Sequence, residues 1–189
     1  MRFTPPPPSQ PARAPPTAPA KAAEAVPVPH LDVCKYVGLW RQTHASLQPL
    51  ITYEVGGRAV TAVYGQTNRS DVLSVRNTTK PRVFLGRSLG VSGWAVQSPK
   101  RNGEFFVDFS GASLLDVTFS APNYVVIILG DIVDEGIYDY AVVSTPNKGS
   151  LFVLARNVER FETLYEEEVL RRIAALGFTS TWNRPRRTT

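Results

Sequence analysis

Two apolar segments joined by a turn, and followed at once by a helical pattern, constrain the fold more than any other part of the chain. The segments Ile137–Ser144 and Ser150–Arg156 are rich in the β-branched and aromatic residues that favour a pleated, half-buried surface. The residues between them, Thr145–Gly149, include the proline and glycine that are typical of turns. The sequence therefore predicts a β-hairpin.

The hydrophobic period changes directly after this hairpin. Apolar residues then recur at helical spacing, and Gly177 follows them as a helix-stop signal. The recurring residues are Phe161, Tyr165, Val169, Ile173 and Leu176. A single C-terminal helix is therefore expected after the last strand.

The chain before the hairpin has strand character at meander spacing. The expected strands are Val37–Ala45, Arg58–Tyr64, Asp71–Asn77, Val91–Gln97, Glu104–Phe109, Leu114–Phe119 and Tyr124–Leu129. An antiparallel sandwich or a closed barrel would suit this pattern, and closure is favoured because it removes the two exposed sheet edges. The expected fold is an all-β, up-and-down antiparallel barrel of about eight or nine strands with one C-terminal α-helix packed outside.

Three regions follow from composition. Residues 1–29 hold ten of the 16 prolines, and we expect a disordered Pro/Ala-rich tail there. Residues 30–178 should form the barrel and its helix, and residues 179–189 a basic C-terminal tail. No standard signal peptide or transmembrane segment is found, which favours a cytoplasmic or organellar location over secretion but leaves the compartment open.

The net charge of +5 comes largely from the two ends of the chain. This distribution argues against nucleic-acid binding and leaves open a contact of the tails with a protein or an acidic membrane surface. The single cysteine, Cys34, excludes an intrachain disulfide, and with only His30 and His44 no zinc-type cluster can form. No metal and no cofactor are predicted, and the oligomeric state is left open.

Three short motifs in chain order carry a family resemblance. They are Gly38-Leu39-Trp40 on the first strand, Tyr138-Asp139-Tyr140 before the penultimate strand, and Leu154-Ala155-Arg156 at the end of the last strand. With a helix directly after the third motif, the chain resembles the lipocalin family over about residues 31–185. Within that family it is most similar to the branch of apolipoprotein D and the bacterial and plant lipocalins. One strand more than the family's usual set is expected between Ser92 and Phe119.

The resemblance implies a barrel that holds an apolar ligand and whose narrow end is closed by the motif residues. Arg156 is expected to pack over Trp40 and to bind nearby backbone carbonyls, and a guanidinium over an indole gains roughly 0.5–2 kcal/mol. Gly38, Trp40, Asp139 and Arg156 are therefore expected to be structural. No catalytic residue is predicted, because no Ser-His-Asp or Cys-His arrangement and no phosphate-binding loop is found.

Alternation along the strands predicts which side chains line the interior. The predicted ligand-binding residues are Gln42, His44, Ala62, Tyr64, Tyr124, Val126, Ile128, Tyr138 and Tyr140. A single bulge would reverse the parity of a strand. The acidic run Glu166–Glu168 is expected to be a solvated helix face near the positive end of the helix dipole.

The function expected from these features is binding and transport of a small hydrophobic ligand, such as a fatty acid, lysolipid, sterol, retinoid or pigment, without catalysis. The alternative is a non-enzymatic scaffold or assembly protein, in which the barrel is a support and the Pro-rich and basic tails bind protein or membrane partners. The tails motivate this alternative, because a simple carrier does not need them.

Overall fold

A computed structural model describes residues 24–47, 49, 57–81, 89–111, 121–133 and 136–188. The strands are β1 (Gly38–Ala45), β2 (Gly57–Gln66), β3 (Val72–Pro81), β4 (Leu89–Gln97), β5 (Glu104–Asp108), β6 (Tyr124–Leu129), β7 (Tyr140–Ser144), β8 (Leu151–Ala155) and β9 (Arg186–Arg187). The helices are α1 (Val33–Tyr36), α3 (Val158–Leu164) and α4 (Glu166–Ala175). The extra strand expected at Leu114–Phe119 lies outside the described residues.

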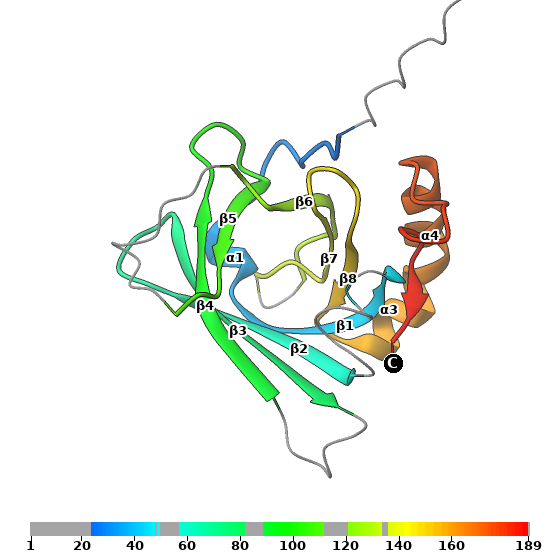
Figure 1. Cartoon of the computed structure of the whole chain (residues 1–189), viewed down its shortest axis with the longest axis horizontal. Coiled ribbons are helices and arrows are strands. Elements are labelled where there is room, and N and C mark those ends of the chain that lie inside the picture. Colours follow the sequence, from blue (N-terminus) through cyan, green and yellow to red (C-terminus); the bar gives the residue numbers. More distant parts are fainter. Residues whose placement is uncertain are drawn as a thin grey trace, which may run out of the picture.

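The strands form one antiparallel sheet that closes on itself. Strands β2 to β8 are hydrogen-bonded in chain order, β1 lies between β8 and β9, and an additional pairing of β1 with β2 closes the ring. The closed barrel therefore comprises β1–β8, with β9 as an extra strand. Figure 1 shows helices α3 and α4 outside the barrel, on the side of β8 and β1. The predicted all-β barrel with a C-terminal helical element outside is confirmed.

The ring is closed at only one end of β1. The residues Gly38–Arg41 pair with Thr61–Tyr64 of β2, whereas His44 and Ala45 pair with β9 instead. Beyond this point β2 continues its pairing with β3, and β3 continues with β4 as far as Leu89. Strands β2, β3 and β4 therefore extend past the region where β1 supports them, as Figure 1 shows.

The helical region differs from the single helix that was expected. Tyr165 has φ −126°, outside the helical range, and separates α3 from α4. Its ring packs at 5.0 Å from the ring of Tyr140 on the barrel wall. The apolar spacing from Phe161 to Ile173 nevertheless places both residues against the barrel, where each is almost completely buried.

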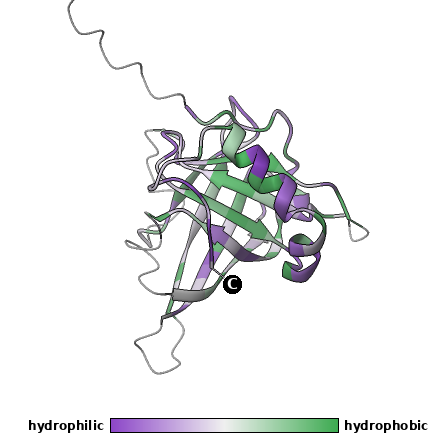
Figure 2. Ribbon diagram, turned by 90° about the vertical axis from the view of Figure 1, so that its right-hand side faces the viewer, coloured by the Kyte–Doolittle hydropathy of each residue, from purple (hydrophilic) through white to green (hydrophobic). Residues whose placement is uncertain are grey.

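Side-chain alternation divides the apolar residues into two clusters. The interior cluster holds Leu31, Val33, Tyr36, Trp40, Ala62, Tyr64, Leu73, Val75, Ala95, Phe105, Val126, Ala141, Val143 and Leu154. The helix-facing cluster holds Ala25, Val125, Ile127, Ile128, Tyr140, Val142, Leu151, Val153, Ala155, Phe161, Val169, Ile173 and Phe178. In Figure 2 the helices, with much hydrophilic surface, lie over strongly hydrophobic strands. None of the helices in the described part of the chain has the length and apolarity needed to cross a membrane.

Both ends of the described chain contact the barrel. Ala25 is 5% exposed and its N–H donates to the carbonyl of Pro146, while the N–H of Val28 donates to the carbonyl of Val126. Residues 24–29 were expected to belong to the disordered tail, but these backbone bonds and the buried Ala25 tie them to the barrel. Residues 1–23 of that predicted tail lie outside the described residues. In the expected basic tail, β9 pairs with β1.

Candidate functional site

The narrow end of the barrel is held together by Arg156. Its guanidinium carbon lies 3.6 Å from the centre of the Trp40 ring. Its Nε donates to the carbonyl of Tyr138 at 3.1 Å, Nη1 to that of Leu39 at 2.9 Å, and Nη2 to that of Val37 at 2.7 Å. A planar guanidinium can make these contacts together because its donors point in fixed, diverging directions. The arrangement agrees with the expected packing of Arg156 over Trp40.

The other motif residues support this arrangement. Gly38 has φ +98°, and a Cβ placed on it would lie 3.1 Å from Nη1 of Arg156. Glycine is therefore required both by the backbone conformation and by the close approach of the guanidinium. The indole N–H of Trp40 donates to the carbonyl of Tyr36 at 2.9 Å. Asp139 is buried and forms an ion pair with Arg160 at 3.2 Å.

Directly inside this end, three tyrosine hydroxyls meet. Tyr64 donates to the hydroxyl of Tyr124 at 2.9 Å, and the hydroxyls of Tyr36 and Tyr124 are 2.8 Å apart. We call these three residues the tyrosine triad. Burial raises the pKa of Tyr64 to about 12 and raises the pKa of Tyr36 and of Tyr124 well above the usual value for a phenol. All three hydroxyls are therefore neutral near pH 7.

Aromatic rings pack against the triad. The ring of Phe105 lies 5.9 Å from Tyr124 in an edge-to-face contact, and Trp40 lies 5.0 Å from Tyr36. Such pairs contribute about 0.5–1.5 kcal/mol beyond the area they bury. The triad thus lies on a packed aromatic floor, with its hydroxyl groups as the polar atoms.

A second part of the interior face, on β4, is apolar and exposed. Leu73 pairs with Ala95 on adjacent strands, and both belong to the interior cluster. Alternation from Ala95 then places Val91 and Leu89 on the same interior face of β4. These two side chains are nevertheless 52% and 53% exposed. Leu89 lies one position beyond the last rung that β1 continues, whereas Val91 lies on the rung that runs through Asn77 and Ala62 to Trp40. An apolar wall, part of the interior face of β4, is therefore exposed to solvent.

Two polar atoms lie on the neighbouring strand of this wall. Asn77 pairs with Val91, and Thr79 pairs with Leu89, so both face the interior. The Oδ1 atom of Asn77 and the Oγ1 atom of Thr79 are buried and have no hydrogen-bond partner among the described residues. Buried polar atoms normally have partners, so this wall offers two positions where a bound molecule could supply one.

Most residues predicted from alternation do line the interior. Ala62, Tyr64 and Val126 belong to the interior cluster, and Tyr124 and Tyr138 pack against it. Gln42 pairs with the interior residue Leu154 and so faces the same side. These residues therefore face the interior, whereas their contact with a ligand stays a prediction.

His44 and Ile128 are placed differently from the prediction. The register of β1 shifts between Gln42 and His44, and that of β6 shifts between Val126 and Ile128. One extra residue in a strand reverses the face of every residue beyond it. Ile128 therefore belongs to the helix-facing cluster, and His44 points to Glu166 of α4, with Nε2 3.1 Å from Oε1.

Tyr140 is also on the helix side, although Tyr138 is inside. Tyr138 precedes β7 and forms only an isolated bridge with Ile132, so the alternation expected from a continuous strand does not apply. The ring of Tyr140 contacts that of Phe161 at 5.6 Å. The interior positions predicted for His44, Ile128 and Tyr140 are therefore wrong.

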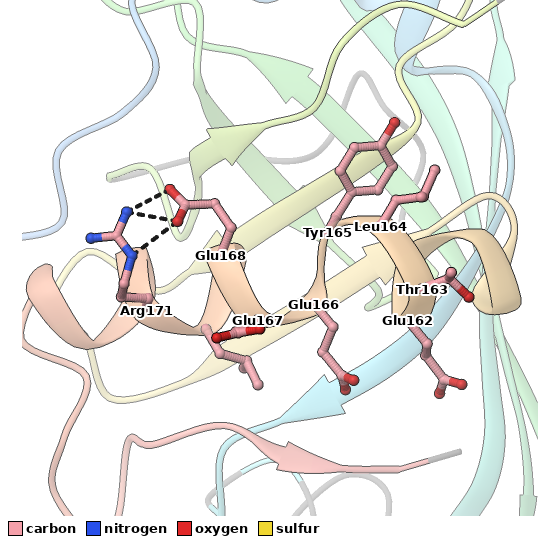
Figure 3. Close-up of a pocket in the computed structure, with 9 residues that line it drawn as sticks. Glu162, Thr163, Leu164, Tyr165, Glu166, Glu167, Glu168 and Arg171 are labelled. Carbon is pink, nitrogen blue, oxygen red and sulfur yellow. Dashed lines mark hydrogen bonds and ion pairs between the residues drawn. The ribbon is translucent and has the colours of Figure 1, made fainter.

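A second candidate site is a groove along α3 and α4 that is lined by Glu162–Glu168, Leu170 and Arg171 (Figure 3). Three of its four carboxylates, those of Glu162, Glu166 and Glu168, have cationic partners. Glu166 is paired with Arg187 at 2.6 Å as well as with His44, and Glu168 is paired with Arg171 at 2.6 Å. No cluster of three or more His, Cys, Asp or Glu side chains that could hold a metal occurs in the described ranges. The groove is therefore an internally paired surface.

The expectation that Glu166–Glu168 is a solvated face is wrong for Glu166, whereas Glu167 and Glu168 are exposed as expected. The Glu166 side chain is only 16% exposed, because β9 brings Arg187 over it. Burial lowers the pKa of His44 below its ordinary value of 6.5, and the adjacent Glu166 carboxylate opposes this shift. The neutral imidazole that burial favours can still donate from Nε2 to Glu166.

Several candidate residues were not predicted. Alternation along β4 would have predicted that the side chains of Val91 and Leu89 face the interior, since Ala95 fixes which residues of that strand face inward. Tyr36 had no such signal, because α1 brings it across the end of the barrel from outside the strands. Asn77 and Thr79 would have followed from the pairing of β3 with β4, which the sequence does not specify.

Comparison with known proteins agrees with this architecture. The lipocalin-like domain profile matches residues 31–185, and the chain therefore belongs to the lipocalin-like family. No curated protein matches the chain. The narrower resemblance to the apolipoprotein D branch stays a prediction.

Solved structures share the fold at low sequence identity. Insecticyanin from the tobacco hornworm Manduca sexta has a TM-score of 0.59 and 16% identity, with 86% of this chain and 82% of that chain covered. Lobster apocrustacyanin A1 has a TM-score of 0.52 and 19% identity, covering 82% and 78%. Japanin from Rhipicephalus appendiculatus, solved with bound cholesterol, has a TM-score of 0.53 and 11% identity, covering 84% and 95%.

Proposed function

We propose that this protein binds a small hydrophobic ligand inside its barrel and shields it from water, without catalysing a reaction. The observation that carries the proposal is the half-exposed apolar wall at Leu89 and Val91, which faces the barrel interior. Soluble proteins normally bury such interior-facing side chains. Covering apolar surface on binding gains roughly 25 cal/mol for each Å² removed from water.

Two further observations support a binding function. The motif residues are used for structure: Arg156 and Trp40 hold the narrow end together and are not arranged around a reacting group. The fold relative japanin was solved with cholesterol, an apolar molecule with one hydroxyl group. A ligand of the same general class, a small and largely apolar molecule, suits the interior described here.

The apolar wall can be tested with one charged substitution and a matched control. Val91→Glu would force a ligand to bury a carboxylate without a partner, which costs several kcal/mol. We expect at least ten-fold weaker binding of the neutral fluorescent probe N-phenyl-1-naphthylamine, a loss of about 1.4 kcal/mol or more. Fluorescence titration of the full chain measures this affinity.

Val63→Glu is the control for this experiment. Val63 is 43% exposed, and it faces outward because its neighbours Ala62 and Tyr64 are interior. It should bind the probe as the wild type does. Equal binding by the Val91 and Val63 variants, or no saturable binding by the wild type, would contradict the proposal.

The alternative role for the tails gains no specific support. Residues 1–23 lie outside the described part of the chain, and Arg187 of the C-terminal segment is paired with Glu162 and Glu166 of the same chain. The charge of Arg187 is therefore already used within the chain.

A further inference from the structure

The tyrosine triad has one more proton than its own hydrogen bonds use. Two hydrogen bonds join the three hydroxyls, Tyr64 to Tyr124 and Tyr36 to Tyr124, and each uses one proton. A neutral phenol carries one proton, so three are present. Among the described residues, no other hydrogen bond is made by these hydroxyl groups, and one O–H is left without an acceptor.

The position of this proton follows from the connectivity. Because Tyr64 donates to Tyr124, the unused proton belongs either to Tyr36 or to Tyr124. Tyr36 is 1% exposed and enclosed by the rings of Trp40 and Phe105, whereas Tyr124 is the least buried of the three. An unpaired buried donor costs about 1–3 kcal/mol, so the favourable arrangement has Tyr36 donating to Tyr124. The hydroxyl of Tyr124 then carries the unused proton.

We infer that the hydroxyl of Tyr124 donates a hydrogen bond to a neutral oxygen, such as a hydroxyl, ketone or aldehyde, at the buried end of the bound ligand. This inference rests on the proposed function and names the chemistry that the interior selects. The apolar body of the ligand would then lie along the wall that contains Val91 and Leu89. A hydrocarbon of the same shape would leave the Tyr124 proton without an acceptor.

An ionised carboxylate suits this position poorly. The phenols of the triad are neutral, and Arg156, whose charge acts on Tyr36, lies against Trp40 with its N–H groups on backbone carbonyls. A carboxylate at the triad would lose its hydration without replacing the existing partners of Arg156, and the cost of removing an ion from water is several kcal/mol. The buried end of the ligand is therefore neutral.

A set of ligands with one apolar body and different end groups tests this chemistry. We choose all-trans-retinol, all-trans-retinal, all-trans-retinoic acid and the hydrocarbon anhydroretinol, with affinity measured by quenching of tryptophan fluorescence at pH 7.4. For the wild-type chain, retinol and retinal should bind about three- to ten-fold more tightly than anhydroretinol, as expected for one neutral hydrogen bond. Tyr124→Phe should remove this preference and leave the affinities for anhydroretinol and for retinoic acid unchanged.

Three other Tyr→Phe variants serve as controls. Without the hydroxyl of Tyr36 or of Tyr64, the remaining pair still forms one hydrogen bond and keeps one unused proton on Tyr124. Both variants should keep the preference for retinol. Tyr165→Phe removes a hydroxyl on the helix side of the barrel wall, where the ring packs on Tyr140, and it should bind as the wild type does. Thermal unfolding of each variant verifies that it is folded.

The outcomes separate the inference from the proposed function. Equal wild-type affinities for retinol and anhydroretinol, or a preference that persists in Tyr124→Phe, would overturn the inference while the proposed function stands. Absence of binding by all four retinoids would overturn the inference too. If N-phenyl-1-naphthylamine also failed to bind, the proposed function would fall with it.

Discussion

Replacement of Arg156 by lysine is expected to lower the free energy of unfolding by about 3 kcal/mol or more. The guanidinium serves the carbonyls of Tyr138, Leu39 and Val37 and lies 3.6 Å over the Trp40 ring. The compact ammonium group of lysine keeps the charge but has no planar face and cannot reach diverging acceptors together. Three backbone carbonyls, two of them in partly buried hydrogen bonds, would lose their partners at the narrow end of the barrel. Urea unfolding, followed by tryptophan fluorescence, measures the difference.

Arg171→Lys is the matched control for this substitution. Arg171 is exposed on α4 and pairs with Glu168 on the same surface. Exposed ion pairs contribute at most about 1 kcal/mol, so this variant should unfold nearly as the wild type does. If Arg156→Lys were as stable as Arg171→Lys, the assigned role of Arg156 in closing the barrel would be wrong.

The second large effect is expected from Phe161→Ala, with a loss of about 3–5 kcal/mol in the free energy of unfolding. Phe161 is 1% exposed and lies between α3 and the barrel wall, where its ring meets Tyr140 at 5.6 Å. Alanine would leave a cavity that the surrounding strands and helices cannot fill completely. The helix-facing cluster is separate from the interior cluster, so the folded variant should bind N-phenyl-1-naphthylamine within about two-fold of the wild type.

Leu164→Ala gives the corresponding control on the same helix. Leu164 is 62% exposed, so its truncation should change the unfolding free energy by less than about 0.5 kcal/mol. Similar losses for Phe161→Ala and Leu164→Ala would show that α3 is not docked through Phe161. A large loss of probe binding in the folded Phe161 variant would contradict the separation of the two clusters.

The sequence was informative where local chemistry decides the structure. The β-branched segments around the Thr145–Gly149 turn predicted β7 and β8, and the apolar spacing after Arg156 predicted a helical element against the barrel. The three motifs predicted the contact of Arg156 with Trp40 because these residues recur together in the family that the chain resembles. Periodicity and short motifs were therefore sufficient for the fold and for its narrow end.

The candidate site was harder to predict because it depends on register and on distant segments. The register shifts before His44 and Ile128 have no distinct residue signal, and each reverses the face of the residues beyond it. The pairing of β9 with β1 depends on the return of the C-terminus to the barrel, and it is what buries Glu166 beside Arg187. The triad depends on Tyr36, which reaches the interior from α1. Tertiary packing fixes all three features.

The most direct test of a ligand in the barrel is native mass spectrometry of the gently purified full chain, followed by organic extraction of what it carries. We expect a discrete additional mass of a few hundred daltons, the order expected for a molecule largely enclosed in such an interior. The extracted molecule should be largely apolar with a neutral oxygen at one end. A bare protein mass, together with no uptake of retinol or N-phenyl-1-naphthylamine, would contradict ligand binding as the function of this barrel.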